Sequence, residues 1–391
     1  MLKTTVSHSL ELDSKDAIED VLEQCKEQLG DLTPRAGLLS AGSNHNHSFF
    51  LSSIKEVYPE IELIGGTSLG ELSFVHGVTN DSIVLTLFCS DDLHFKAGLA
   101  EKISEDPFNH LKNAVELTKS GFNHNIDLCI TTPSAMPLID GSYRLINSDD
   151  TLQGMKQGLG DKIPVVGGCS VGPLDQGDFQ FYNFQVYKDS APFLLISGPL
   201  LFSIGVENGF VPIGNKTKVT HAEKNIVYKI GDKSPLDFYE HYLGKSDIIG
   251  ISEYALAVYE NDEDHFVLRS GMYLDESRGS ISFSGNVPQG ATVQLTHAIR
   301  DNLIESVHKS VNSAITNYPG LKPSVALCFS CGGRNWILGT RTKEEYEVLK
   351  TYLPDLPVAG FYAAGEIGLT GIEKNCLIHT ASFVCVLIGT E

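Results

Sequence analysis

The stretch Leu63-Ile-Gly-Gly-Thr-Ser-Leu-Gly-Glu-Leu72 has two counterparts further along the chain. They are Val165-Val-Gly-Gly-Cys-Ser-Val-Gly-Pro-Leu174 and Val358-Ala-Gly-Phe-Tyr-Ala-Ala-Gly-Glu-Ile367. Before each of these glycine boxes the sequence predicts a strand, a helix and a second strand, so the chain contains a weak internal repeat. Loops at the exits of equivalent strands are where α/β proteins usually bind ligands. The boxes therefore indicate both a repeated α/β fold and the place of a ligand site.

The boxes differ in detail. The glycines that we pair are Gly66 with Gly70, Gly168 with Gly172, and Gly360 with Gly365, and the last pair has one more residue between its members. Glu71 and Glu366 directly follow the last glycine, whereas Pro173 takes this place in the second box. A carboxylate there either pairs with a cationic ligand group or caps the next segment and faces solvent. The glycines themselves either line a ligand or form tight structural turns.

Periodicity and capping residues predict the helices. One begins at Asp13-Ser-Lys-Asp16 and ends at Gly30, and another spans 297–318. Ser234-Pro-Leu-Asp237 and Thr342-Lys-Glu-Glu345 each predict a capping box that opens a helix. Short apolar runs predict strands at Ala36–Leu39, Ser82–Phe88, Asp127–Thr131, Val165–Val166, Pro192–Ile196, Ala255–Tyr259, Val325–Phe329 and Ser382–Ile388.

Helices and strands alternate, which predicts an α/β fold. We expect mixed sheets flanked by helices and built from repeated strand–helix units. Two sub-domains are expected, over residues 1–225 and 226–391, because 391 residues exceed a single typical domain. A region from about Lys216 to Val293, richer in strand and turn signals, inserts between two α/β stretches.

Composition excludes several classes of partner. The chain carries 29 Lys+Arg against 49 Asp+Glu, a net charge of −20, which argues against nucleic acid and anionic membranes. The uncharged stretch Ala191–Val206 is shorter than the roughly 20 residues a membrane helix needs and contains prolines. The polar N-terminus is unlike a signal peptide, and most of the eight cysteines lie in apolar runs. We therefore expect a cytoplasmic protein with reduced thiols and no membrane insertion.

A nucleotide site does not fit the boxes. Gly360 and Gly365 have P-loop spacing, but Glu366 and Ile367 stand where Lys and Ser or Thr are required. A carboxylate there would repel phosphate. Gly158-Leu-Gly160 lacks the third glycine of a dinucleotide fingerprint. A carboxylate beside loop N–H groups and small hydroxyls instead suits a zwitterion, since the N–H groups can hold the ligand's carboxylate.

The segment Ala326-Leu-Cys-Phe-Ser-Cys-Gly-Gly-Arg334 offers a second group of candidates. Cys328 is expected in the core, while Cys331 to Arg334 form the loop after the strand. Arg334 can bind a carboxylate with two parallel hydrogen bonds. Cys331 has no nearby His or Asp in sequence, which favours a buried thiol over a nucleophile. Without a second Cys-x-x-Cys pair, no metal site is expected.

Two further motifs have weaker functional interpretations. Asn44-His-Asn-His47 starts a predicted helix, where exposed cap-region residues are expected rather than a metal site. Trp336, the single tryptophan, follows the Arg334 loop and fits either a pocket wall or core packing.

These motifs resemble those of the FIST sensory domains. The third box with its run-up, Leu353 to Gly368, is similar to the family's C-terminal G-F-x-x-x-G-E-I-G signature. Phe329-Ser-Cys-x-Gly-Arg334 resembles its F-x-C-x-x-R segment, and the first box its N-terminal G-x-S-x-G-E element. Val219–Val227, Leu236–Gly244 and Ser280–Gly290 resemble the junction between the halves. The resemblance implies FIST N-terminal-like and C-terminal-like domains in an intracellular small-ligand sensor, amino acids being the usual proposal.

We therefore expect a standalone sensor that binds an amino acid or similar metabolite and acts through a separate signalling output protein. No catalytic residue, metal or cofactor is expected. The predicted ligand-binding residues are Thr67, Ser68, Glu71, Cys169, Ser170, Cys331, Arg334, Tyr362 and Glu366. The alternatives are a thiol-dependent enzyme that uses Cys331 or Cys169, and a protein-interaction scaffold.

Overall fold

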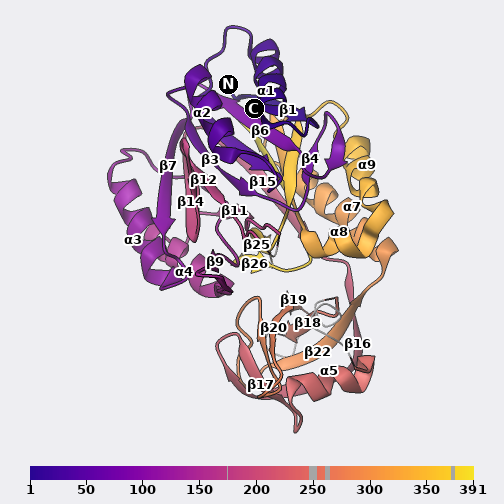
Figure 1. Cartoon of the computed structure of the whole chain (residues 1–391). Coiled ribbons are helices and arrows are strands. Elements are labelled where there is room, and N and C mark those ends of the chain that lie inside the picture. The colour runs from indigo at the N-terminus through magenta and orange to yellow at the C-terminus, as the bar shows by residue number, and fades with distance from the viewer. Residues whose placement is uncertain (174, 246–252, 260–264, 371–374) are drawn as a thin grey trace.

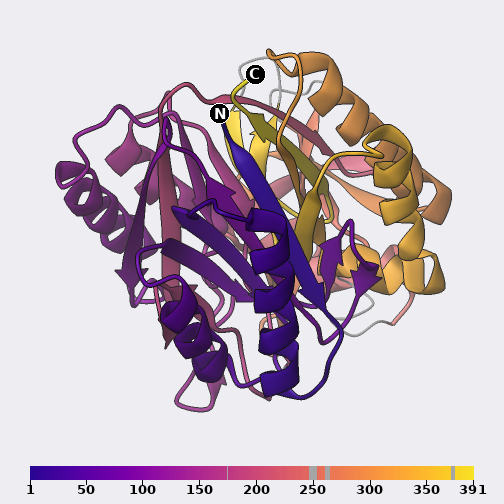
Figure 2. The same ribbon diagram turned by 90° about the horizontal axis from the view of Figure 1, so that it is seen from above.

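The structure is a computed structural model that describes residues 1–173, 175–245, 253–259, 265–370 and 375–391. Leu174, the last residue of the second glycine box, lies outside these ranges. Strands gather in the middle of the larger body and helices lie around it (Figure 1, Figure 2). The predicted α/β class with mixed, helix-flanked sheets is confirmed.

The larger body consists of three repeats that share the order strand, helix, strand, helix, strand, hairpin and strand, with a short extra hairpin in the second and two short extra helices in the third. The first contains β1 (Lys3–Ser9), α1 (Ser14–Leu29), β2 (Ala36–Ala41), α2 (His47–Val57), β3 (Glu62–Thr67), β4 (Glu71–Ser73), β5 (Gly77–Thr79) and β6 (Ile83–Cys89). The second contains β7 (His94–Glu101), α3 (Pro107–Ser120), β8 (Leu128–Thr131), β9 (Leu138–Ile139), β10 (Ser142–Tyr143), α4 (Ser148–Leu159), β11 (Val165–Gly168), β12 (Gln180–Tyr182), β13 (Gln185–Tyr187) and β14 (Ser190–Ser197). The third contains β15 (Leu201–Glu207), α7 (Arg300–Asn317), β23 (Val325–Cys331), α8 (Gly332–Leu338), η1 (Gly339–Arg341), α9 (Lys343–Tyr352), β24 (Val358–Ala363), β25 (Glu366–Thr370), β26 (Asn375–His379) and β27 (Phe383–Gly389).

An inserted β-domain interrupts the third repeat between β15 and α7. It contains β16 (Phe210–Glu223), β17 (Ile226–Ile230), α5 (Pro235–Leu243), β18 (Leu256–Tyr259), β19 (Phe266–Arg269), β20 (Gly271–Asp275), β21 (Ser280–Phe283) and β22 (Thr292–Ala298). These strands form a sheet in the order β19-β18-β22-β16-β17-β21-β20. The predicted strand-rich insertion is therefore present. The expected boundary near residue 225 falls between β16 and β17 and remains a prediction.

Each repeat supplies the centre of one six-stranded sheet. The orders are β1-β6-β2-β3-β12-β13, β7-β14-β8-β11-β25-β26 and β15-β27-β23-β24-β4-β5. In each, the two middle strands are parallel and joined through a helical segment, as parallel neighbours require. The remaining neighbours are antiparallel.

Neighbouring repeats exchange hairpins in a closed cycle. The hairpin that follows the first box, β4–β5, pairs with β24 of the third repeat. The hairpin after the second box, β12–β13, pairs with β3 of the first. The hairpin after the third box, β25–β26, pairs with β11 of the second. Each glycine box is thus the crossing where the chain leaves one sheet for the next.

The hydrophobic core follows this arrangement. One cluster lies where the inner faces of the three sheets meet, with Ile64, Val166 and Phe361 among its members. Three further clusters lie between each sheet and its own helices. Because both faces of the central strands are buried, these strands are continuous apolar runs in the sequence, as in Val384-Cys-Val-Leu-Ile388.

The local capping signals have mixed outcomes. The Asp13 carboxylate accepts hydrogen bonds from the amides of Lys15 and Asp16 at the start of α1, and Ser234 accepts one from Asp237 at the start of α5. The capping box predicted at Thr342 is wrong, because Glu345 is buried and pairs with Arg334 instead. Asn46 caps α2 as expected, but the predicted exposure of its flanking histidines, His45 and His47, is wrong because both pack in the interior.

Candidate ligand site

The three boxes occupy the same register in their sheets. Gly65, Gly167 and Gly360 lie opposite Leu39, Thr131 and Cys328 of the neighbouring parallel strand. A Cβ at these glycines would lie 1.9, 1.9 and 1.8 Å from the carbonyl oxygen of the opposite residue. Only glycine allows this approach of the backbones. These three glycines are equivalent. The first glycine of each pair is therefore Gly65 and Gly167, not Gly66 and Gly168 as predicted, and the expected extra residue in the third box is wrong.

Backbone hydrogen bonds join the boxes into a ring. Leu69 donates to the carbonyl of Tyr362, Val171 to that of Thr67, and Ala364 to that of Cys169, over 3.1, 3.0 and 3.0 Å. These three bonds are equivalent under the repeat. The boxes therefore have a structural role in holding the three sheets together, as the tight-turn alternative expects.

A hydrogen-bonded triplet of polar side chains forms at each of the first two boxes. In the first repeat, the Glu71 carboxylate accepts hydrogen bonds from the hydroxyl of Ser68 at 2.5 Å and from the hydroxyl and amide of Ser82 at 2.7 and 3.1 Å. Glu71 is buried, so the alternative in which it caps the next segment and faces solvent is excluded. Burial raises the pKa of Glu71 to about 7, while the hydrogen bonds from both serines act in the opposite direction.

The equivalent of Glu71 in the second repeat is Gln180, not Pro173. Gln180 lies opposite Gly66, as Glu71 lies opposite Phe361 and Glu366 opposite Gly168. Its side-chain amide donates to the Ser170 hydroxyl at 3.1 Å, and its oxygen accepts from the hydroxyl of Ser190 at 3.1 Å. Seven residues, 173–179, separate Gly172 from Gln180, which conceals this equivalence in the sequence.

The third repeat departs from the other two at one position. Ala363 takes the place of Ser68 and Ser170, so Glu366 lacks that hydroxyl donor. Glu366 Oε2 accepts from the amide of Ser382 at 3.0 Å, whereas buried Oε1 has no hydrogen-bonded nitrogen or oxygen among the described residues. Burial raises the pKa of Glu366 well above its ordinary range, although the Cys331 thiol and Arg334 oppose this.

Arg334 lies in a buried network beside the third box. Its Nε and Nη2 donate to Glu345 Oε1 at 2.9 and 2.7 Å, and both side chains are fully buried. The remaining donors bind the carbonyls of Asn208 and Leu303 at 2.9 and 2.8 Å and the Ser306 hydroxyl at 3.1 Å. A ligand carboxylate would have to displace one of these acceptors. Cys331 ends β23 and α8 begins at Gly332, so the loop predicted here is wrong.

The same network includes Tyr362. The Tyr362 hydroxyl donates to Glu345 Oε2 at 2.6 Å, and the Ser330 hydroxyl donates to the same oxygen at 2.9 Å. The sequence predicts Glu345 only as part of a capping box and gives no sign that it pairs with Arg334. The serines that contact Glu71, Gln180 and Glu366 were also not predicted; they are Ser82, Ser190 and Ser382. Their recurrence immediately before or at the start of the last strand of each repeat is a signal that could have found them.

The remaining predicted residues are also interior. Thr67 accepts a hydrogen bond from the amide of Phe179 at 3.0 Å. Burial raises the pKa of the Cys169 and Cys331 thiols, with the carboxylate of Glu366 adding to the effect. A raised pKa disfavours the thiolate that a nucleophilic cysteine needs. Trp336 is 66% exposed on α8, which excludes the core-packing interpretation.

A recess of about 330 Å³ lies between the larger body and the inserted β-domain. Its charged and polar lining includes Lys156 and Gln153 of α4, Glu207 and Asn208 at the end of β15, and His379 of β26. Burial lowers the pKa of His379 to about 4, so this side chain is neutral near pH 7. The volume is within the range of small-molecule sites.

Two of the predicted residues of the third repeat, Glu366 and Arg334, lie directly behind this recess. Ser382 lines the recess and donates its amide to Glu366. Asn208 lines it and accepts from Arg334. Cys169 lines an adjoining cavity of about 30 Å³ that also borders His379. The structure thus brings Glu366, Arg334 and Cys169 next to one recess, while Ser68 and Glu71 belong to the first repeat's own triplet.

Comparison with known proteins defines the class. A model of the FIST N domain matches residues 35–233, and a model of the FIST C domain matches residues 235–369. The chain therefore belongs to the FIST family, whose domains are sensory domains of signal transduction. This confirms the resemblance drawn from the glycine boxes and the Arg334 segment.

Individual relatives are more distant. The chain is 25% identical over 375 residues to an uncharacterized protein of Mycobacterium tuberculosis, covering 91% of this chain and 92% of that protein. It is 22% identical to an uncharacterized protein of Methanocaldococcus jannaschii, covering 93% and 71%. A crystal structure of cyanuric acid hydrolase from A. caulinodans aligns over 100% of this chain and 99% of that one, with a TM-score of 0.41 and 10% identity.

No helix within the described ranges is both long and apolar enough to span a membrane. Among the described residues, no three His, Cys, Asp or Glu side chains are grouped so that they could hold a metal ion.

Proposed function

We propose that this sensory protein binds an amino acid or a similar small zwitterion in the recess between the inserted β-domain and the larger body. The observation that carries the proposal is the position of the recess directly in front of the third box. Its lining residues Ser382 and Asn208 are hydrogen-bonded to Glu366 and Arg334. A ligand that moves either lining residue would act on the buried network behind it.

The charges on the recess walls suit a zwitterion. Lys156 presents an ammonium group that can pair with a ligand carboxylate, and Glu207 presents a carboxylate that can pair with a ligand amine. Burial raises the pKa of Glu207, with Lys309 nearby acting in the opposite direction. The partly desolvated position of Glu207 strengthens its interaction with a cation.

A thermal-shift screen against the proteinogenic amino acids and related zwitterions tests this proposal. A ligand that binds only the folded protein raises the unfolding temperature, since at about 100 times Kd it stabilises by about 2.7 kcal/mol. The shift is expected to disappear in Lys156→Gln and Glu207→Gln. Lys26→Gln and Glu27→Gln, exposed on α1, are the matched controls and should keep the shift. A complete absence of shifts, or equal shifts in all four variants, would overturn the proposal.

We further propose that the protein acts in the cytoplasm through a separate output protein. All eight cysteines are free thiols, which supports a reducing compartment. A sensory domain changes the activity of a signalling partner, and here that change would begin at the Arg334 network. Co-purification of a partner that depends on the ligand, and that Lys156→Gln abolishes, would support this; ligand-independent co-purification would contradict it.

A further inference from the structure

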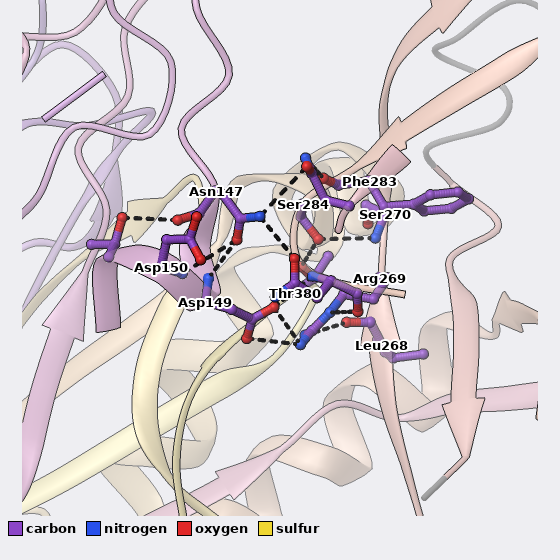
Figure 3. Close-up of polar contacts among 12 residues, drawn as sticks. Asn147, Asp149, Asp150, Leu268, Arg269, Ser270, Phe283, Ser284 and Thr380 are labelled. Carbon is purple, nitrogen blue, oxygen red and sulfur yellow. Dashed lines mark hydrogen bonds and ion pairs between the residues drawn. The ribbon is translucent and has the colours of Figure 1, made fainter. Parts of the chain in front are cut away.

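The inserted β-domain contacts the larger body through two regions of different chemistry. One is an apolar cluster that includes Phe210 and Leu268 of the inserted domain and Leu303, Leu338 and Ala381 of the larger body. The other is polar and contains residues of α4 and Thr380 on one side and residues of β19 and the turn after β21 on the other (Figure 3). The recess lies between them, since Leu268 and Asp149 both line it.

An interdomain ion pair, Asp149–Arg269, forms the centre of the polar region. Arg269 Nη2 lies 3.2 Å from both carboxylate oxygens of Asp149, and the two side chains are 5% and 14% exposed. Asp149 also accepts the amide of Asn286 of the inserted domain at 2.5 Å. Arg269 Nε donates to the Asn286 carbonyl at 3.3 Å. The pair therefore joins the two domains through both charge and backbone contacts (Figure 3).

Gly285 fits tightly against this ion pair. A Cβ at Gly285 would lie 2.7 Å from Arg269 Nε and 2.8 Å from Asp149 Oδ2. Any side chain there would push the two domains apart at this point. Gly285 belongs to the junction segment that resembles the FIST family.

The surrounding contacts are weaker. Asn147 donates to the Asn286 side chain at 2.8 Å, and the hydroxyls of Ser284 and Thr380 are 2.8 Å apart. Lys224 pairs with Asp150 at 2.8 Å, but the lysine side chain is 69% exposed. Exposed pairs of this kind contribute little. The Asp149–Arg269 pair is the best shielded of these contacts.

The opposite end of the recess is anchored to the larger body by a buried arginine. Asn208, in the linker to the inserted domain, is bound by the fully buried Arg334. Gly209 follows with φ +80°, and a Cβ there would lie 2.4 Å from the Asn302 carbonyl. Rotation of the inserted domain is therefore easiest about this linker, with the greatest separation at the polar region.

We propose that the Asp149–Arg269 ion pair holds the inserted β-domain closed over the recess, and that breaking it opens the recess by rotation about the linker at Asn208. This proposal takes one point from the proposed function, which is that the recess binds a ligand. The ion pair then sets how often the recess is accessible.

The thiol of Cys376 reports on this opening. Cys376 lines the recess and is 5% exposed, and its thiol donates to the Val165 carbonyl. Cys25, buried between α1 and its sheet, serves as an internal control for global unfolding. Iodoacetamide labelling of both residues in the ligand-free full chain can be followed by peptide mass spectrometry.

Three variants are expected to label Cys376 about tenfold faster than the native protein, with Cys25 unchanged. Asp149→Asn removes the charge, Arg269→Met removes its partner, and Gly285→Ala keeps both charges but separates them. Asp150→Asn, the neighbouring control, is expected to change the rate by less than about twofold because its own ion pair is exposed.

Two results would overturn the inference. One is an unchanged Cys376 rate in Asp149→Asn and Gly285→Ala; the other is equal acceleration of Cys25 and Cys376, which would show that the contact only stabilises the whole fold. The labelling assay contains no ligand, so the inference about the ion pair does not depend on the result of the thermal-shift screen. A zwitterion that does raise the unfolding temperature is expected to slow Cys376 labelling, and faster labelling would contradict closure on the ligand.

Discussion

The first and third repeats have a glutamate at the same place in the fold, but the hydrogen bonds to its carboxylate differ between them. Glu71 and Glu366 begin the exchanged hairpins and lie opposite equivalent residues of a neighbouring sheet. Both oxygens of Glu71 accept hydrogen bonds from serines. Glu366, beside Ala363, has one oxygen without such a partner among the described residues. The repeat thus determines the position of the carboxyl group, whereas single neighbouring residues determine its hydrogen bonding. Glu366, which has fewer such bonds, lies behind the recess and is hydrogen-bonded to its lining residue Ser382.

The largest effect is expected from breaking the ion pair that distinguishes the third repeat. Glu345→Leu leaves the Arg334 charge buried without its carboxylate and should lower the free energy of unfolding by about 3–5 kcal/mol. Chemical denaturation measures this. The double variant Arg334→Met/Glu345→Leu removes both charges and should recover most of the loss. A single variant within about 1 kcal/mol of the native protein would contradict the burial of this pair.

A smaller loss of stability is expected in all three repeats when the equivalent glycine of each box is replaced. Gly65→Ala, Gly167→Ala and Gly360→Ala each place a methyl group against a carbonyl less than 2 Å away. Each should cost about 1–3 kcal/mol or more in stability, since the strands must separate. Gly121→Ala is the control, because a Cβ there would be 3.7 Å from its nearest neighbour. A neutral change at one of the three glycines would show that its repeat is not equivalent.

Exchanging the serine and alanine tests the comparison directly. Ser68→Ala removes a donor from buried Glu71 and should destabilise the protein by about 1–3 kcal/mol. Ala363→Ser offers Glu366 the donor it lacks and should stabilise by up to about 1 kcal/mol. Urea denaturation of both variants measures the difference. Equal destabilisation by the two changes would mean that the site of Ala363 has no room for a hydroxyl. The difference between Glu71 and Glu366 would then come from packing and not from a missing donor.

The last effect concerns pH and builds up gradually across the titration of Glu71. The pKa of Glu71 rises from 4.5 to about 7 on burial, so the folded state binds the proton more tightly than the unfolded state. Its contribution to stability is therefore complete below pH 4.5 and is lost as pH rises through about 7, with a slope of at most about 1.4 kcal/mol per pH unit. Glu71→Gln, which copies Gln180 of the second repeat, should flatten the pH dependence relative to the native protein. A steeper decline in the variant would contradict the raised pKa.

Much of the fold was predictable because its signals are local. Asp13 and Gly30 delimit α1 through contacts within one helical turn, and apolar runs such as Val325–Phe329 mark doubly buried strands. The three boxes were visible as a repeat. Their exact equivalence was not, because Gly65, Gly167 and Gly360 are defined by a carbonyl on another strand.

The site was less predictable for the same reason. Arg334 has the chemistry of a carboxylate binder, and it does bind one, but the carboxylate is Glu345 of the same chain. Gln180 could not be aligned with Glu71 because an insertion separates it from its box. Lys156 and Glu207 line one recess only because α4 of the second repeat and the end of β15 of the third come together beside the inserted domain.

The amino-acid sequence by itself determined the α/β class, the three boxes, the strand-rich insertion and the resemblance to FIST sensory domains. These follow from periodicity, capping and glycine spacing, which act over a few residues. Only the tertiary structure decided that the repeats exchange hairpins in a cycle, that the box carboxylates are buried, and that the recess lies behind the Asp149–Arg269 ion pair. The physical reason is that hydrogen bonds and burial depend on partners up to hundreds of residues away, and no local pattern identifies them.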